Sequence, residues 1–179
     1  MNKSILVALL GLGIAGSLNA YAVDGTISIT GQVVDASCSV AVSGGANDAT
    51  VVLPTVSKTA LSNPGDVAGA TQVAMSLTGC PSTGSVRAFF EATNVDPATG
   101  FLKNNAATTP AEGVQVQVIN ASTATAIDLR DNSNNDYVPF VDNGTDGTAD
   151  LNYSVQYVAT APATSGLVDT SLMYTLDYQ

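Results

Sequence analysis

The chain has 179 residues, with five Lys and Arg against fifteen Asp and Glu, and its formal net charge is −10. This balance argues against nucleic-acid binding, because phosphate neutralisation needs clustered Lys and Arg side chains. Histidine is absent, which removes the usual base of a catalytic triad and the commonest zinc ligand. Composition therefore predicts a protein that is not an enzyme and that carries no cofactor.

Residues 1–22 have the organisation of a secretory signal peptide. Lys3 precedes the apolar run Ile5–Ile14, and small residues follow at Ala20 and Ala22. A charged start, about ten apolar residues and an A-x-A end form the pattern that a signal peptidase reads. We expect cleavage after Ala22, with cleavage after Ala20 as the alternative. The apolar run is too short to span a bilayer, which needs about twenty residues, and no later segment has a membrane-spanning pattern.

The segment that follows the signal, residues 23–33, alternates strictly between two kinds of side chain. One face carries Val, Gly, Ile, Ile, Gly and Val, and the other carries Asp, Thr, Ser, Thr and Gln. Period-two alternation of this kind is typical of a half-buried β-strand.

Six further segments have a strand pattern, and turn-forming residues separate them. The predicted strands are Thr50–Leu53, Val73–Leu77, Val86–Ala92, Val114–Ile119, Leu151–Ala159 and Val168–Tyr178. The predicted turns are at residues 43–45, 63–66, 81–84, 96–97 and 143–144. No stretch has the pattern of an amphipathic helix. The sequence therefore predicts an all-β domain, an antiparallel sandwich of about seven short strands.

The most polar segment, Asp128–Asp150, is rich in Asp and Asn. We interpret it as a solvated loop with Asx turns. A calcium-binding loop is the alternative, but Asp136 occupies the position where the sharp turn of such a loop needs glycine, and no helices flank it.

The two cysteines of the chain are Cys38 and Cys80. Export to an oxidising compartment favours one disulfide between them, and two free buried thiols are the alternative. The bond would close a loop of about 40 residues, which corresponds to roughly 4 kcal/mol of stabilisation.

The last fourteen residues, Gly166–Gln179, also alternate between apolar and polar side chains. A strand of this kind at the edge of a sheet has unpaired backbone groups unless something pairs with it. The predicted strand of residues 23–33 is a possible partner, from the same chain or from a second copy. The alternative is that residues 23–33 fold back into their own sandwich.

Several motifs, taken in order, resemble those of the pilin subunits of chaperone–usher fimbriae, near the type 1 major-subunit branch. Residues 31–38 look like the family's G-x-V-x-x-x-x-C motif, and residues 51–54 match its short second element. Residues 73–80 match alternating apolar residues that end in L-x-x-C, and Tyr157–Ala159 match an aromatic-led strand. Tyr178 corresponds to the family's penultimate tyrosine.

The resemblance implies an incomplete immunoglobulin-like β-sandwich that lacks its final strand and is completed by a donor strand from another subunit. It divides the chain into a signal peptide at 1–22, a donor-strand extension at 23–30 and a pilin domain at 31–179. Val23, Gly25, Ile27 and Ile29 would be the donor residues that face the groove, with Gly25 at a shallow pocket.

The implied function is a structural subunit of an extracellular fimbria that supports cell adhesion. Its partners would be identical or related pilin subunits, a periplasmic chaperone and an outer-membrane usher, and it would pass through the periplasm to the cell surface. The chaperone would recognise the C-terminal strand, at Tyr174, Leu176, Tyr178 and Gln179. A minor or adaptor pilin is an alternative in the same class, and a secreted carbohydrate-binding β-sandwich is an alternative in another.

Overall fold

The structure is a computed structural model that describes Ser28 and residues 38–179. The predicted signal peptide, the donor residues Val23, Gly25, Ile27 and Ile29, and Gly31 lie outside the described residues. Within the described part of the chain, no helix is long and apolar enough to cross a membrane.

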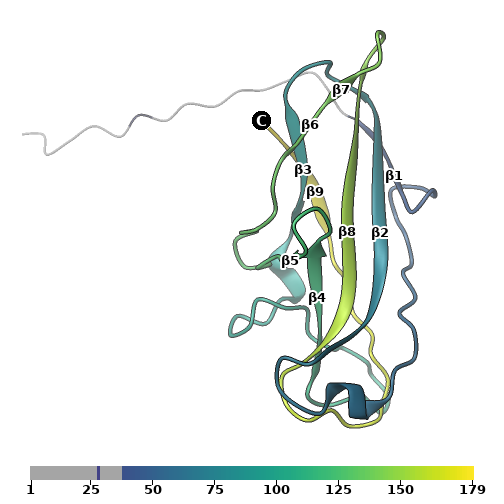
Figure 1. The fold of residues 1–179 in the computed structure, drawn as a ribbon, viewed down its shortest axis with the longest axis vertical. Coiled ribbons are helices and arrows are strands. Elements are labelled where there is room, and N and C mark those ends of the chain that lie inside the picture. Colours follow the sequence, from purple (N-terminus) through teal and green to yellow (C-terminus); the bar gives the residue numbers. More distant parts are fainter. Residues whose placement is uncertain (1–27, 29–37) are drawn as a thin grey trace, which may run out of the picture. The chain divides into compact units, whose positions relative to one another are not determined.

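A six-stranded antiparallel sheet forms one layer of the fold, with β1, β2, β8, β4 and β5 in that order and β7 paired to β8 (Figure 1). Its two central strands are long, and they pair along most of their length. The strands are β1 (Ser39–Val42), β2 (Val67–Cys80), β4 (Val114–Asn120), β5 (Thr125–Ala126), β7 (Val141–Asp142) and β8 (Gly147–Ala159).

A smaller sheet forms the other layer, with strand order β6-β3-β9. Its members are β3 (Ser85–Phe90), β6 (Val138–Pro139) and β9 (Tyr174–Tyr178), and all pairs are antiparallel. Two short 3-10 helices complete the secondary structure, η1 (Lys58–Leu61) and η2 (Ala92–Asn94). The hydroxyl of Ser57 accepts a hydrogen bond from the Thr59 amide at the start of η1.

The core lies between the two sheets and takes apolar side chains from both. The smaller sheet contributes residues of β3 whose exposed fractions are 5% or less, namely Val86, Ala88 and Phe90. The larger sheet contributes the apolar residues of β2, β4 and β8, among them Met75, Leu77, Val116, Val118, Leu151 and Tyr153. The Phe90 and Tyr153 rings meet edge to face, with centroids 5.0 Å apart, so they join the two layers directly.

The predicted strands are largely confirmed, but two of them are much longer than expected. β2 has 14 residues and β8 has 13, whereas the alternation predicted only their second halves. The first half of β8 has no clear hydrophobic alternation in its sequence, because its buried face carries the small residues Gly147 and Ala149. A Cβ on Gly147 would lie 1.8 Å from the carbonyl oxygen of Pro81, so a small residue is required where β8 passes the end of β2.

The predictions of strands at Thr50–Leu53 and Val168–Met173 are wrong. Neither segment belongs to a ladder among the described residues, although residues 174–178 do form β9. Both segments keep the alternation of exposed and partly buried side chains that led to the prediction. They are therefore extended segments without a strand partner along one side.

The prediction that residues 128–150 form a solvated loop is wrong in part. Asx turns are present, since Asp131 and Asp142 accept hydrogen bonds from the amides of Ser133 and Gly144. However, residues 147–150 belong to β8, and Asn132 and Asn135 are buried, with exposed fractions of 2% and 3%. Their side-chain amides bond to the backbone of β3, which is why polar side chains are buried here.

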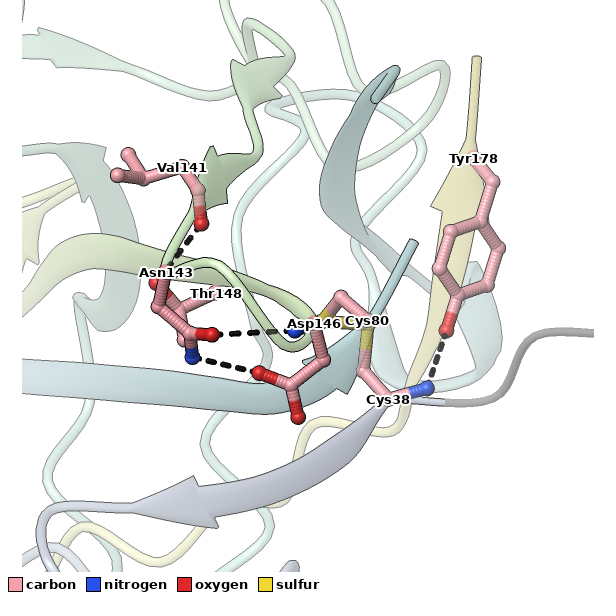
Figure 2. Close-up of a disulfide and its surroundings, with 7 residues drawn as sticks. All are labelled: Cys38, Cys80, Val141, Asn143, Asp146, Thr148 and Tyr178. Atoms are coloured by element: carbon pink, nitrogen blue, oxygen red, sulfur yellow. Dashed lines mark hydrogen bonds between the residues drawn. A yellow bond between two sulfur atoms is a disulfide. The ribbon is translucent and has the colours of Figure 1, made fainter. Parts of the chain in front are cut away.

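The predicted disulfide is confirmed: Cys38 and Cys80 are bonded, and the described residues contain no free cysteine. The bond joins the start of β1 to the end of β2. Figure 2 shows the Tyr178 side chain of β9 pointing at this corner, where its hydroxyl accepts a hydrogen bond from the Cys38 amide at 3.3 Å. The same corner therefore ties the larger sheet to the last strand of the smaller one.

We predict that replacing both cysteines, Cys38→Ser with Cys80→Ser, lowers the free energy of unfolding by roughly 4 kcal/mol, because the unfolded chain regains the entropy of a long open loop. Denaturant unfolding of the two proteins measures the difference. Alkylation of the native wild-type protein, followed by mass spectrometry, is the control and should find no free thiol. Two alkylated cysteines in native material would contradict the prediction.

Candidate functional site

Among the described residues, the last strand, β9, lies at the edge of the smaller sheet and pairs only with β3. Ser85 and Gln179 exchange both of their backbone hydrogen bonds at 2.9 Å, which fixes the phase of this ladder. In an antiparallel pair, alternate residues point their backbone groups away from the partner strand. The N–H and C=O groups of Tyr174, Leu176 and Tyr178 therefore face the opposite side, where the described residues provide no backbone partner.

A groove opens on this side of the molecule between two extended segments. One rim is residues 47–53, which follow β1, and the other is residues 169–174, which lead into β9. Along both rims the side chains alternate, so that Leu53 and Leu172 line the groove while Val52 and Met173 point outward. Val52 and Met173 are 79% and 55% exposed. Both rims therefore show the alternating exposure that is typical of strands. Among the described residues, no strand lies between them.

The floor of the groove is apolar and belongs to the core. It is made by the inward side chains of three strands of the larger sheet together with Phe90 and Leu102; those side chains are Val73, Met75, Val116, Val118, Tyr153 and Val155. The cavity has a volume of about 490 Å³, within the usual range of sites that enclose a ligand. An apolar floor between two strand-like rims is suited to an extended segment with alternating apolar side chains.

Two tyrosines of β9 contact the segments that flank β1, and Tyr174 reaches the other rim. Tyr174 donates a hydrogen bond from its hydroxyl to the Asn47 carbonyl at 2.8 Å, and Tyr178 accepts one from the Cys38 amide. The Tyr174 pKa is raised, first because the ring is partly buried and second because Asp48 is nearby. Tyr174 thus marks one end of the cavity, and further along β9 the Tyr178 hydroxyl contacts the residue that precedes β1.

The outer face of β9 is fixed to the rest of the sheet by Asp177. Its carboxylate lies 2.9 Å from the Arg87 guanidinium and accepts a hydrogen bond from the Tyr137 hydroxyl at 2.6 Å. The Arg87 guanidinium also stacks on the Tyr137 ring, 4.4 Å from its centroid. These contacts hold β9 against β3 on the face opposite the groove.

The pKa of Tyr137 is raised above its ordinary value of 10.0, chiefly because its hydroxyl donates to Asp177 and also because burial disfavours the phenolate. The positive charge of Arg87 acts in the opposite direction.

The described residues offer no constellation for chemistry at or near the groove. No group of three or more His, Cys, Asp or Glu side chains among them could hold a metal ion. The polar rim residues Asn47, Asp48, Asp169, Thr170 and Ser171 are those of an exposed border. The shape of the groove and its open backbone groups are suited to an extended chain segment.

The structure brings together some of the residues that the sequence singled out. Tyr174, Leu176 and Tyr178 share the inward face of β9 and pack against the core, and Tyr174 lines the groove. Gln179 has an exposed side chain, and its backbone pairs with Ser85. A role for these four residues in chaperone recognition stays a prediction.

Sequence reasoning missed several residues that shape the site. Asn47 and the Arg87–Tyr137–Asp177 cluster carry no pattern that distinguishes them from other surface residues. The pair Asn132 and Asn135 lies in a run of polar residues, where burial cannot be inferred from residue type. The groove rims left a signal, since their alternation predicted strands, although their partner strand is not among the described residues.

Comparison with known proteins agrees with this geometry. The profile of a family described as type-1 fimbrial protein, A (FimA), matches residues 53–179. The major fimbrial subunit SMF-1 of Stenotrophomonas maltophilia (strain K279a) is 42% identical over 179 aligned residues, which cover 92% of this chain and 98% of the relative. The F17 fimbrial protein of Escherichia coli is 39% identical and covers 94% of each chain. A solved chaperone–usher pilus structure has a TM-score of 0.58 at 23% identity, covers 87% of this chain and 95% of the other, and shows a similar fold.

The fold and the groove define an immunoglobulin-like β-sandwich that, as far as residues 38–179 form it, lacks a strand at one edge. The chain belongs to the type-1 fimbrial protein family. It is accordingly a structural subunit of a cell-surface fimbria, not an enzyme, and it assembles with other subunits.

We predict that Tyr137→Phe lowers the free energy of unfolding by about 1 kcal/mol at neutral pH, because the hydrogen bond to the Asp177 carboxylate is lost. A raised pKa means that the folded state holds the tyrosine proton more tightly. The difference between wild type and variant should therefore persist at pH 7 to 9 and shrink as the pH rises through the raised pKa. Urea unfolding of both proteins, from pH 7 to a pH above the raised pKa of Tyr137, measures this difference in the free energy of unfolding. A difference that grows with pH would contradict the prediction.

Proposed function

We propose that the subunit polymerises by donor-strand exchange, with the groove beside β9 receiving an extended segment from the next subunit. The observation that carries this proposal is the unpaired edge of β9 above an apolar floor, with the second rim at residues 47–53. An inserted strand would pair with the open backbone groups of Tyr174 at the end of the cavity and, continuing along β9, with those of Leu176 and Tyr178. Its inward side chains would fill the cavity of about 490 Å³.

The donor is the N-terminal segment of a second copy or of a related subunit. Its sequence places Val23, Gly25, Ile27 and Ile29 on one face, which would point into the groove, while Thr26 and Ser28 would point outward. Burying each Val or Ile side chain is worth roughly 1.5–3 kcal/mol. Several such side chains, together with a row of backbone hydrogen bonds, would hold a fibre without covalent links between subunits.

Before assembly, a periplasmic chaperone fills the same groove with one of its own strands, and an outer-membrane usher exchanges that strand for the donor. The chaperone docks on β9 through Tyr174, Leu176, Tyr178 and Gln179. An apolar groove with an open strand edge is hazardous for an unassembled protein, because it invites non-specific pairing. A temporary occupant removes that hazard while the subunit crosses the periplasm.

In the assembled fimbria the subunit supports adhesion by forming the fibre. The full sequence has a net charge of −10, which becomes −11 when the signal peptide is removed with Lys3, and this charge is expected to keep the exposed fibre surface soluble. In this scheme, the neighbouring subunit fills the apolar groove.

We predict that deleting Val23–Ile29 leaves a subunit that folds on its chaperone but forms no fibres, because the donor face is lost while the groove remains. Ile27→Asp with Ile29→Asp should act in the same way, since two charges in an apolar groove cost several kcal/mol. Gly25→Leu should slow docking by overfilling a shallow pocket. Co-purification with the chaperone and electron microscopy of cell surfaces measure the two steps.

The matched control for this experiment is Thr26→Asp with Ser28→Asp, which places the same charges on the outward face. These variants should assemble, because their carboxylates remain in solvent. Fibres from the truncated chain would refute donor-strand exchange. Collapse of the truncated domain would instead indicate that residues 23–29 complete their own sandwich.

A further prediction concerns the acceptor strand. Tyr174→Asp, or removal of Tyr178 and Gln179, should abolish accumulation of the subunit in the periplasm, because the chaperone loses its docking strand. Thr175→Asn is the control, since Thr175 is exposed on the opposite face of β9. Immunoblots of periplasmic extracts report the subunit level. Normal levels and normal fibres from the Tyr174→Asp chain would count against this assignment.

A further inference from the structure

The smaller sheet has a second edge, on β3. Among the described residues, the outward backbone groups of Ala88 and Phe90 have hydrogen-bond partners, unlike those of β9. β6 pairs with β3 only at Ser85 and Val86, so in the described part of the chain the rest of β3 has no strand on that side. The ladder phase that points Tyr174 and Leu176 away from β3 also points their opposite residues, Phe90 and Ala88, away from β9. By backbone geometry alone, β3 would therefore present a second open edge.

Side chains occupy that edge instead of a strand. Asn132 accepts a hydrogen bond from the Phe90 amide at 2.8 Å and donates one to the Phe90 carbonyl at 2.9 Å. Asn135 donates to the Ala88 carbonyl at 2.7 Å, and the Tyr153 hydroxyl accepts from the Ala88 amide at 3.3 Å. The same Tyr153 hydroxyl donates to the side-chain oxygen Oδ1 of Asn135 at 3.2 Å. All four outward backbone groups of Ala88 and Phe90 are thus satisfied.

The side-chain amide of Asn132 imitates a strand residue. An antiparallel partner exchanges one N–H and one C=O bond with the residue opposite, and a carboxamide supplies the same donor and acceptor. Asn132 itself has a φ of +58°, a left-handed conformation that asparagine adopts more readily than most residues. Asn132 and Asn135 are both almost fully buried, so water cannot replace them at β3 without opening the loop.

We infer that Asn132 and Asn135 close the β3 edge to strand addition, so that each subunit accepts one donor strand, at β9 alone. The inference rests on the proposed function, because it concerns which edge receives the donor. An extended segment forms the same backbone hydrogen bonds with any open strand edge, so its sequence alone does not restrict it to β9. Two acceptor edges per subunit would give branched assemblies, whereas one gives a linear fibre.

The excluded occupant is the same segment that fills the groove, the N-terminal strand of a second copy. Its backbone would need the N–H and C=O groups of Ala88 and Phe90. To reach them it would have to displace two buried asparagine side chains and the Tyr153 hydroxyl, leaving these polar groups without partners. Unpaired buried polar groups oppose such an exchange. At β9 the same insertion displaces no backbone pairing among the described residues, where the side-chain bonds are those of the Tyr174 and Tyr178 hydroxyls to Asn47 and Cys38.

The test counts the strands bound by the full mature chain. A synthetic peptide of residues 23–33 is added in excess, and native mass spectrometry gives the number of peptides per chain. We expect one peptide on the wild type and two on the double variant Asn132→Ala with Asn135→Ala. Asn120→Ala is the matched control and should bind one, because Asn120 is buried and contacts the same loop at Asn134 but does not contact β3.

Two peptides on the wild type, or one on a folded double variant, would overturn the inference and leave donor-strand exchange standing. No peptide on the wild type would refute donor-strand exchange itself, and this inference with it.

If the double variant does not fold, amide hydrogen exchange on the unassembled wild-type chain tests the inference instead. The Ala88 and Phe90 amides should exchange at least about 100-fold more slowly than those of Tyr174 and Leu176. Equal rates at the two edges would overturn the inference.

Discussion

The backbone groups of Tyr174, Leu176 and Tyr178 face away from β3 and meet no backbone partner among the described residues, and the other features of the domain follow from this open edge. An unpaired edge is a template for pairing with another chain, so the position of its strand determines what can bind there. The Asp177 contacts with Arg87 and Tyr137 fix β9 on the face away from the groove. The disulfide and the Tyr178 hydroxyl hold the facing corner of the larger sheet. The strand on one side of the groove and the sheet corner on the other side are thus both held in place.

The sequence predicted the parts of this fold whose side chains alternate clearly in hydrophobicity. β4 was expected at Val114–Ile119 and lies at Val114–Asn120, because large apolar residues mark its inward face. The first halves of β2 and β8 were missed because Gly and Ala take the inward positions there and leave little contrast. The segments Thr50–Leu53 and Val168–Met173 alternate like strands and yet join no ladder. Alternation records which side chains are buried, and it does not record whether a neighbouring strand is present.

The polar segment at residues 128–150 shows the opposite limit of prediction from sequence, because buried residues there have no apolar pattern. Residue type suggests that a run of Asn, Asp and Ser is solvated, and most of its members are. Asn132 and Asn135 are buried because the backbone of β3 needs donors and acceptors at that edge, a requirement set by tertiary structure and invisible in the local sequence. The groove itself was predictable only through resemblance to a family, since no local pattern states that a strand is missing.

The position of the disulfide has a mechanical consequence for a fibre under tension. Cys38 stands where the chain enters β1, which pairs with β2 over only four residues. A pull applied from the preceding segment would shear this short ladder if the chain were held by hydrogen bonds alone. The Cys38–Cys80 bond passes the load covalently to the end of β2, whose 14 residues pair along β8. The many hydrogen bonds of the β2–β8 ladder then share the force that reaches β2.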